Sequence, residues 1–320
     1  MNKKEFIAKI DQKMGQILKD DLKILSKIKK FVIKSGGKRV RPVIHYYFTE
    51  MLGYKGKNWQ DIGAVGELIH AASLLHDDVI DDSERRRGQP TLHALYNNKT
   101  AILAGDYLLG CAFDHLRTLG QNNEFFGIFT SVVRMLSAGE LLQMQWQSNL
   151  KIPEKVYDRI IFCKTASLFG AMVASSAVLC GLDAQTADKY RQFGETMGRI
   201  FQIRDDYLDY FTPPSVTGKP AFQDFERGIV TRPVILMQKK LGSSDKITLK
   251  KIWSSDDMRK SEEGKVVLKT LLLKSGIQNK MEAEIEEGIH SLMHFVRQHD
   301  VSPIREKILE NLNELMIPKS

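Results

Sequence analysis

Two acidic segments of the chain carry carboxylates at a spacing suited to a hard metal ion. The first is DDVIDD (77–82), which follows an apolar run without proline, and the second is DDYLD (205–209). Residues four positions apart share one face of a helix, so Asp77 is aligned with Asp81, and the second segment repeats this pairing. Because like charges at this spacing repel, we expect a cation between them. Carboxylate oxygens suit Mg²⁺, which keeps several waters and bridges to substrate phosphates.

A single segment of this kind is also typical of a solvated acidic helix end. The second copy favours the metal site, because both segments end apolar helical stretches and both precede a basic loop. If the two helix ends face each other, they form a carboxylate-lined mouth for metal ions and a polyanionic ligand. We therefore expect the remaining elements to position these two segments together.

Three basic segments are candidates for binding such a polyanion. GGKRVRP (36–42) places three cations after flexible glycines at a helix start, where backbone N–H groups add to an anion site. RRRG (85–88) follows the first acidic segment, and the planar guanidinium of arginine suits diphosphate oxygens. Lys219 lies shortly after the second acidic segment. The alternative for each is a solvated basic loop.

Two further polar residues share a helical register with the acidic segments. His70 precedes Asp77 by seven residues, which is two helical turns, and Gln202 precedes Asp205 by three. We expect both side chains to face the ligand. For His70 the alternative is a structural histidine that is satisfied within the core.

Composition narrows the class of protein. With 42% hydrophobic and 27% charged residues, the 320-residue chain is typical of a soluble globular protein. The net charge of +8 is spread along the chain without interleaved aromatic residues, which argues against nucleic acid and favours a small acidic substrate. Three isolated cysteines indicate free thiols in a reducing, cytoplasmic compartment. The uncharged stretch 166–182 is short and rich in small residues, so we expect a buried helix and no transmembrane segment.

Helical periodicity dominates the chain, and strand signals are nearly absent. No linker divides the sequence, so we predict one domain over residues 1–320. The expected fold is all-α, a single-domain bundle of antiparallel helices around a central catalytic cavity. The predicted helices lie at 4–18, 20–34, 38–53, 58–82, 91–96, 100–119, 123–149, 154–180, 184–210, 221–241, 246–254, 261–275, 279–298 and 303–316.

Taken together, the motifs resemble those of the trans-isoprenyl diphosphate synthases of the polyprenyl synthetase family. The resemblance implies the isoprenoid synthase type of fold, a homodimer, and a head-to-tail condensation. An allylic diphosphate ionises, isopentenyl diphosphate attacks the cation, and loss of a proton gives a longer chain. The matching segments, which run in order from residue 36 to 233, are GGKRVRP (36–42), LIHAASLLHDDVIDDSERRRGQPT (68–91), GDYLL (105–109), GELLQ (139–143), KTASLF (164–169), FQIRDDYLD (201–209) and GKP (218–220).

The resemblance also implies a role for each matching residue. Mg²⁺, as three ions, is held by Asp77, Asp81 and Asp205, with Asp78 and Asp209 in support. The allylic diphosphate is bound by Arg86, Lys164 and Lys219, helped by Thr165 and Gln202. Isopentenyl diphosphate is bound by Lys38, Arg41, His70 and Arg87. The implied catalytic residues are Asp77, Asp81, Arg86, Lys164, Asp205 and Lys219, and the released diphosphate takes the proton.

Two segments bear on product length and on departures from the family pattern. Ala72 and Ser73 are small, whereas a Phe or Tyr there would plug the product tunnel near fifteen or twenty carbons, so we expect an all-trans product longer than C20. The alternative is that these small residues only allow close helix packing. GIVTRP (228–233) has Arg232 where the family has leucine and lacks the usual lysine at Ile229. Sequence alone does not explain Arg232.

Other functions stay open at this point. A short-chain farnesyl or geranylgeranyl diphosphate synthase is one alternative, and a non-catalytic partner subunit of a heteromeric synthase is another. A class I terpene cyclase also uses DDxxD, but its usual second motif differs from the DDYLD of this chain. The sequence does not determine the exact product length, the preferred allylic primer, the downstream pathway or the need for a second subunit.

Overall fold

The computed structural model of the chain describes residues 3–19, 21–37, 39–119, 124–217 and 220–315. In this part of the chain nearly all regular structure is helical, which confirms the predicted all-α class. The helices group into two compact units whose sequences interleave.

Unit 1 comprises residues 1–134, 168–194 and 302–305. It contains most of the N-terminal half of the chain and the parts of α7, α9 and α10 that fall within these ranges. Its elements are α1 (Lys3–Ile17), α2 (Lys23–Lys34), α3 (Val40–Met51), α4 (Trp59–Ile80), β1 (Arg85–Arg86), β2 (Gln89–Pro90), α5 (Leu92–Leu95), α6 (Asn98–Thr118), α7 (Glu124–Trp146, to residue 134), α9 (Ser167–Leu179, from residue 168) and α10 (Ala184–Phe211, to residue 194).

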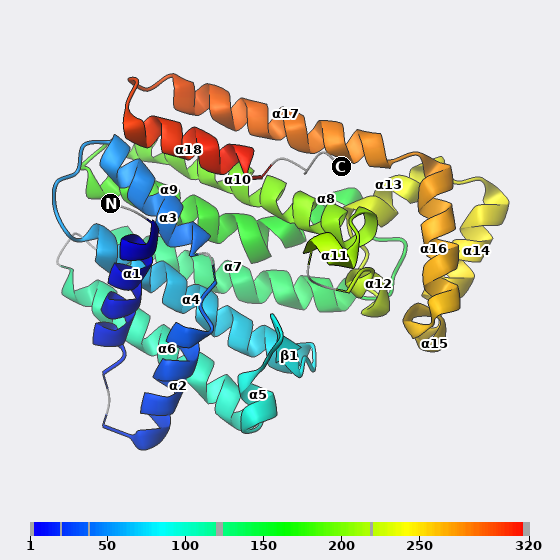
Figure 1. Cartoon of the computed structure of the whole chain (residues 1–320), viewed down its shortest axis with the longest axis horizontal. Coiled ribbons are helices and arrows are strands. Elements are labelled where there is room, and N and C mark those ends of the chain that lie inside the picture. Colours follow the sequence, from blue (N-terminus) through cyan, green and yellow to red (C-terminus); the bar gives the residue numbers. More distant parts are fainter. Residues whose placement is uncertain (1–2, 20, 38, 120–123, 218–219, 316–320) are drawn as a thin grey trace. The chain divides into compact units, whose positions relative to one another are not determined.

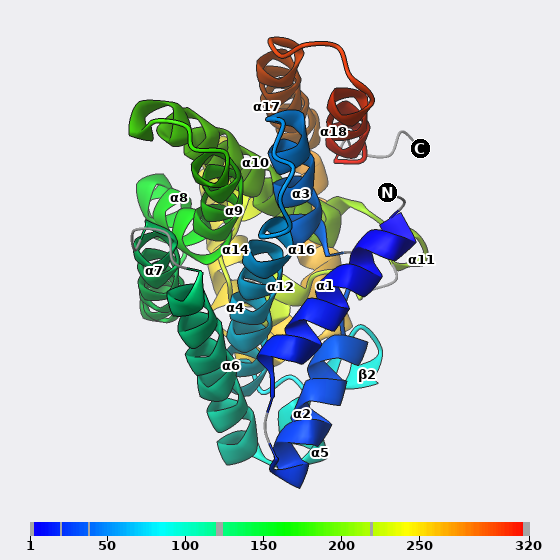
Figure 2. The same ribbon diagram turned by 90° about the vertical axis from the view of Figure 1, so that its left-hand side faces the viewer.

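Helix α4 carries the first acidic motif and packs against α1, α3 and α6 (Figure 1 and Figure 2). Ile62, Leu68, Ile69 and Leu75 are buried, and the absence of proline lets the helix run for six turns. Helix α6 approaches closely at Gly105, where an added Cβ would lie 2.2 Å from the His76 Nε2 atom. This close packing holds the acidic end of α4 on a rigid support.

Unit 2 comprises residues 135–167, 195–301 and 306–320. It contains the second acidic motif and most of the C-terminal helices. Its further elements are α8 (Glu154–Ile161), the π-helical segment η1 (Phe162–Ala166), α11 (Pro214–Thr217), α12 (Gln223–Glu226), α13 (Arg232–Lys240), α14 (Ser243–Trp253), α15 (Asp256–Lys260), α16 (Glu262–Ser275), α17 (Gln278–Arg297) and α18 (Pro303–Asn313, from residue 306).

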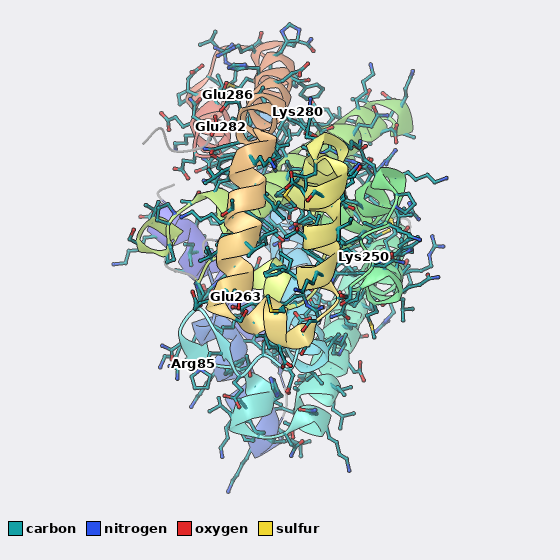
Figure 3. All side chains as sticks on the ribbon, turned by 90° about the vertical axis from the view of Figure 1, so that its right-hand side faces the viewer. Arg85, Lys250, Glu263, Lys280, Glu282 and Glu286 are labelled. Atoms are coloured by element: carbon teal, nitrogen blue, oxygen red, sulfur yellow. The ribbon has the colours of Figure 1, made fainter. Side chains whose placement is uncertain are left out.

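Helix α16 lies beside α14, as Figure 3 shows with Lys250 on α14 and Glu263 on α16. Its ends follow from its sequence. The Ser261 hydroxyl accepts the Gly264 N–H at 3.0 Å and caps the first turn, and Gly276 ends the helix at φ 62°, where glycine is favoured. Helix α16 therefore has well-defined ends, and it packs against α14.

Apart from shifts of a few residues at helix ends and the short helices α11 and α15, which were not predicted, the observed helices differ from the predicted ranges in three places. The predicted helix 154–180 is interrupted by η1 and is therefore α8, η1 and α9. The predicted helix 221–241 is divided into α12 and α13, because Gly228 has φ 71° and cannot continue a right-handed helix. The predicted helix 58–82 ends at Ile80, since Asp82 has φ 48°.

Two helical stretches are long and apolar enough to cross a membrane by length and composition alone. They are Glu124–Trp146 and Glu154–Leu179, and the most apolar 18 residues of these stretches are 22% and 89% buried, respectively. The second contains most of the uncharged stretch 166–182, and its burial agrees with the predicted core helix. The first leaves apolar side chains of α7 exposed.

A buried histidine of unit 1 leads to a prediction about stability. His45 is fully buried, and its Nδ1 lies 2.9 Å from the Met172 carbonyl oxygen. Burial lowers the pKa of His45 to about 4, although hydrogen bonds to the Met172 and Trp59 backbone oppose the shift. Below pH ~6.5 the unfolded chain therefore binds a proton that the folded protein does not accept until pH ~4.

We expect the free energy of unfolding to fall as the pH decreases from about 6.5 to about 4, with about 3 kcal/mol of the loss due to His45. The comparison is urea unfolding of the wild type and His45→Gln across this range. The variant lacks the titrating group, so its free energy of unfolding should depend less on pH. Parallel pH profiles for the two proteins would show that His45 does not contribute.

Candidate active site

The first acidic motif ends α4 and contacts an arginine. Asp77 lies in the last turn, and the Asp81 backbone N–H donates to the Asp77 carbonyl at 2.8 Å. Asp78 is 4% exposed, and its Oδ1 accepts from Arg86 Nε and Nη2, each at 2.8 Å. Burial raises the pKa of Asp78, and Arg86 opposes this shift. Asp78, predicted to support the metal, and Arg86, predicted to bind the diphosphate, thus form an ion pair with each other.

Arg86 reaches Asp78 from a short hairpin that the sequence did not predict. Strands β1 and β2 pair antiparallel, and the turn between them consists of Arg87 at φ 51° and Gly88 at φ 77°. Two consecutive residues with positive φ are typical of a two-residue hairpin turn. Such turns favour Asn-Gly or Asp-Gly, so an Arg-Gly turn gives little signal in the sequence.

The basic loop before α3 lies against this hairpin. An added Cβ at Gly37 would lie 2.1 Å from Arg87 Nη1, so the Arg87 side chain approaches the loop backbone. Arg39, at the start of α3, is 4% exposed and has φ 49°. Its guanidinium donates to Glu67 on α4 and to Asp11 on α1, each at 2.7 Å. Arg39 therefore anchors the basic loop to two helices.

Arg41 and His70 have the electrostatic properties of an anion site. Burial lowers the pKa of Arg41 to about 10, and the nearby charge of Arg87 acts in the same direction, whereas Glu67 opposes it. The Arg41 Nε atom is buried without a hydrogen-bond partner in the described residues. Burial, with Arg41 and Arg87 among the nearby cations, holds the pKa of His70 well below its usual value. An anionic ligand would satisfy the unused guanidinium donor beside a neutral imidazole.

The second acidic motif lies in α10, within unit 2. Asp205 is exposed, and Asp209 accepts the backbone N–H groups of Gln223 at 3.0 Å and Asp224 at 3.1 Å, which begin α12. Burial, followed by the charges of Asp209, Asp206 and Asp205, raises the pKa of Asp224 well above its usual value. Asp224 is therefore a further carboxylate near this motif, although it belongs to none of the sequence motifs.

Asp206 differs sharply from its exposed neighbour Asp205. It is 2% exposed, and its carboxylate accepts from the Tyr157 hydroxyl at 2.6 Å, Gln202 Nε2 at 3.0 Å and the Arg232 backbone N–H at 3.3 Å. Burial raises the pKa of Asp206 to about 7, while these three donors oppose the shift. Asp206 is thus a buried acceptor that connects α10 with α8 and α13.

Lys164 and Thr165 lie in η1, and π-helical segments are frequent at functional sites. Lys164 Nζ pairs with the Glu140 carboxylate of α7, and Thr165 Oγ1 donates to Gln202 Oε1 at 2.8 Å. Helix α7 approaches at Gly139, where an added Cβ would lie 2.9 Å from Lys164 Cγ. Through Gln202, the predicted diphosphate ligand Thr165 is connected to Asp206. Glu140 belongs to the GELLQ segment, but the sequence did not indicate its pairing.

The two residues expected to set product length differ in their surroundings. Ala72 is fully buried, whereas Ser73 is half-buried and donates its hydroxyl to the His70 carbonyl at 2.9 Å. Of the two, Ser73 is the residue whose side chain keeps accessible surface.

The predicted site residues fall into two groups, one in each unit. The two acidic motifs belong to different units, and it remains a prediction that they meet. The role assigned to each residue is also a prediction. Lys38 and Lys219 lie outside the described residues. Unit 1 holds Arg41, His70, Ala72, Ser73, Asp77, Asp78, Asp81, Arg86 and Arg87, and unit 2 holds Lys164, Thr165, Gln202, Asp205 and Asp209.

The donor set is suited to Mg²⁺. No three His, Cys, Asp or Glu side chains form a metal cage within the part of the chain that the structure describes. Each motif instead offers a pair of carboxylates four residues apart, Asp77 with Asp81 and Asp205 with Asp209, and every metal-binding atom of these pairs is an oxygen. Mg²⁺ prefers one or two carboxylates together with water and substrate phosphates, so an incomplete oxygen set fits this ion better than a closed cage would.

Comparison with known proteins agrees with the fold and the motifs. The chain matches the Polyprenyl synthetase family over residues 22–271. It is 32% identical over 229 residues to octaprenyl diphosphate synthase of Escherichia coli (strain K12), and the aligned region covers 72% of this chain and 71% of that protein. It is 35% identical over 229 residues to all-trans-nonaprenyl-diphosphate synthase (geranyl-diphosphate specific) of Rhodobacter capsulatus, covering 71% of this chain and 70% of that protein.

A solved structure gives the same result for the fold. Polyprenyl synthase from Caulobacter crescentus CB15, crystallised in complex with calcium and isoprenyl diphosphate, superposes with a TM-score of 0.88. The sequence identity is 27%, and the match covers 98% of this chain and 94% of that one. The chain therefore belongs to the polyprenyl synthetase family of prenyltransferases.

Proposed function

We propose that this enzyme condenses isopentenyl diphosphate with an allylic diphosphate, head to tail, to give an all-trans polyprenyl diphosphate longer than C20. The allylic C–O bond breaks, the double bond of isopentenyl diphosphate attacks the allylic cation, and a proton leaves to restore a double bond. The observation that carries the proposal is that each acidic motif has predicted diphosphate-binding cations in its own unit, Arg86 in unit 1 and Lys164 in unit 2.

In unit 1, Arg41, His70 and Arg87 bind the diphosphate of isopentenyl diphosphate together with Lys38. The support is the half-buried Arg41 side chain, whose Nε atom is buried without a hydrogen-bond partner in the described residues, and the approach of Arg87 to Gly37. Arginine binds such an anion through two parallel hydrogen bonds, which fixes its orientation as well as its position. The homoallylic substrate is thereby held in one pose for attack on the cation.

The allylic diphosphate is bound by Arg86, Lys164 and Lys219, with Thr165 and Gln202 in support. Lys164 pairs with the Glu140 carboxylate, so its ammonium group has the charge and the position to take a diphosphate oxygen as an anionic partner. Asp77, Asp81 and Asp205 would hold Mg²⁺, as three ions by the family resemblance, with Asp78 and Asp209 in support. Bound Mg²⁺ supplies Lewis-acid stabilisation of the charge that develops on the leaving diphosphate.

Product length depends on the face of α4 that precedes Asp77. We expect Ser73→Phe to shift the main product to about twenty carbons or fewer. Ser73 is half-buried, so its side chain has room to be replaced by a phenyl ring, and the ring would block the path of the growing product chain. Chromatography of the dephosphorylated products gives the distribution directly. Ala72→Phe is a less direct test, since overpacking a fully buried site costs about 1–3 kcal/mol of stability. An unchanged product series in a folded Ser73→Phe protein would contradict the role of Ser73.

The proposal includes a cytoplasmic homodimer formed by a single-domain chain. Exposed apolar side chains on α6 and α7, including Leu103 and Phe126, support a dimer contact, since burying them removes apolar surface from water. Phe126 also packs on Phe113 of α6, with ring centroids 5.6 Å apart, so the two helices share this face. All three cysteines are free thiols, as expected in a reducing compartment.

The purified chain, incubated alone with Mg²⁺, an allylic primer and labelled isopentenyl diphosphate, tests the proposed function. Elongated diphosphates longer than C20 are the expected result. Cyclic hydrocarbons would identify a terpene cyclase, and products no longer than twenty carbons would identify a short-chain synthase. No product from the chain alone would favour the partner-subunit alternative.

A further inference from the structure

Arg232 is the residue of unit 2 that sequence alone does not explain, and its guanidinium is largely buried. Its Nη2 donates to Glu284 Oε1 at 2.7 Å and its Nε to Glu284 Oε2 at 3.2 Å, which is a forked pair with α17. Its Nη1 bonds to Glu154 at the start of α8. Burial opposes the charge, but Glu284 and Glu154 outweigh it and raise the pKa of Arg232. One side chain thus joins α13 to two other helices.

Besides its pair with Arg232, helix α17 contacts the acidic segment 205–209 itself. The Tyr207 hydroxyl donates to Glu282 Oε1 at 2.5 Å, and Gln278 Nε2 donates to both of these oxygens at 3.0 Å. Figure 3 shows Glu282 on α17. This helix begins at Gln278, after the end of the family match at residue 271. The contact therefore comes from a helix outside the matched part of the chain.

The Arg232 anchor acts on the acidic motif through the backbone. Because Arg232 is the first residue of α13, its N–H is unused by the helix, and it donates to Asp206 Oδ2 at 3.3 Å. The Tyr157 hydroxyl, from α8, donates to the same oxygen. The Arg232 guanidinium, which joins α13 to α8 and α17, therefore also fixes the position of the Arg232 backbone N–H that donates to Asp206. A leucine at this position has no polar atom with which to make that anchor.

We infer that Arg232 and Glu284 are positioning residues that fix the second acidic motif for metal binding, with Glu282 holding Tyr207 from the same helix. The inference rests on the proposed function, because Asp205 and Asp209 are the carboxylates that it positions. Asp206 lies between them and is held on both carboxylate oxygens, so the orientation of this part of α10 is set from α8, α13 and α17. Residues that orient metal ligands in this way typically change metal affinity when replaced.

The chain offers a matched pair of variants on α17. Glu284→Gln and Glu286→Gln make the same chemical change two residues apart, and Glu286 is exposed (Figure 3). Calorimetric titration of Mg²⁺ in the presence of inorganic pyrophosphate measures metal binding, and the Mg²⁺ dependence of elongation gives a second readout. We expect Glu284→Gln and Arg232→Leu to weaken apparent Mg²⁺ affinity about tenfold while turnover at saturating Mg²⁺ changes little. Arg232→Lys keeps one ionic contact and should recover part of the affinity, and Glu286→Gln should match the wild type.

The inference is overturned if Glu284→Gln and Arg232→Leu bind Mg²⁺ as Glu286→Gln does. A lower unfolding temperature with unchanged Mg²⁺ affinity would overturn it as well, because that result assigns Arg232 to stability alone. A wild-type protein that binds pyrophosphate independently of Mg²⁺ would instead contradict the proposed function, and the two failures are therefore distinguishable.

Discussion

Replacing Asp77 by Asn should lower the turnover number by about a thousandfold, which corresponds to about 4 kcal/mol of lost transition-state stabilisation. The physical reason is that departure of the allylic diphosphate requires neutralisation of its developing charge. The amide of Asn is neutral and is a weaker ligand for a hard cation than a carboxylate. Single-turnover elongation with saturating substrates and Mg²⁺ measures the effect on the chemical step.

Asp82→Asn is the matched control for Asp77→Asn. Asp82 is exposed and has φ 48°, a conformation that Asn tolerates, so this variant makes the same chemical change without strain. It should retain nearly all activity. Near-normal turnover in Asp77→Asn, with its thermal unfolding unchanged, would contradict the metal assignment for the first motif.

Replacing Arg41 by Met should raise the dissociation constant of isopentenyl diphosphate about a hundredfold, because about 3 kcal/mol of charge-assisted hydrogen bonding is lost. The stability of the free protein should not fall. Burial lowers the pKa of Arg41 to about 10, so the guanidinium stays charged at neutral pH although its desolvation is unfavourable. An apolar side chain of similar length removes that unfavourable burial.

Arg117→Met is the control for this second variant. Arg117 is exposed on α6, where its Nη2 pairs with Asp114 Oδ1 at 2.9 Å. The affinity for isopentenyl diphosphate should stay within about twofold of the wild type, since an exposed charge outside the basic segments is screened by salt. If Arg41→Met destabilises the protein while its substrate affinity is unchanged, Arg41 is a structural cation and not a ligand for diphosphate.

The parts of this protein that sequence predicted depend on local rules. The helical period placed α4 and aligned Asp77 with Asp81, and the absence of proline and of strand patterns indicated an all-α chain. The family motifs added the reaction class, which the comparisons support. Burial of most of the uncharged stretch 166–182 was also predictable, because small uncharged residues suit a core helix.

The parts that sequence did not predict depend on partners far apart in the chain or on unusual backbone. Asp206 accepts from Tyr157, 49 residues earlier, and Arg232 is paired with Glu284, 52 residues later. No local pattern identifies such partners. The Arg87-Gly88 turn lacks the usual turn residues, and η1 has the composition of an ordinary helix.

The central claim is that both acidic motifs hold Mg²⁺ on one allylic diphosphate. The most direct measurement is the Mg²⁺-dependent affinity of a non-ionisable allylic thiolodiphosphate, determined by calorimetry for the wild type, Asp77→Asn and Asp205→Asn. The account predicts that each single replacement removes most of the Mg²⁺-dependent affinity, although the two residues lie 128 positions apart in the sequence (205 − 77). Wild-type affinity and Mg²⁺ dependence in either variant would contradict the claim.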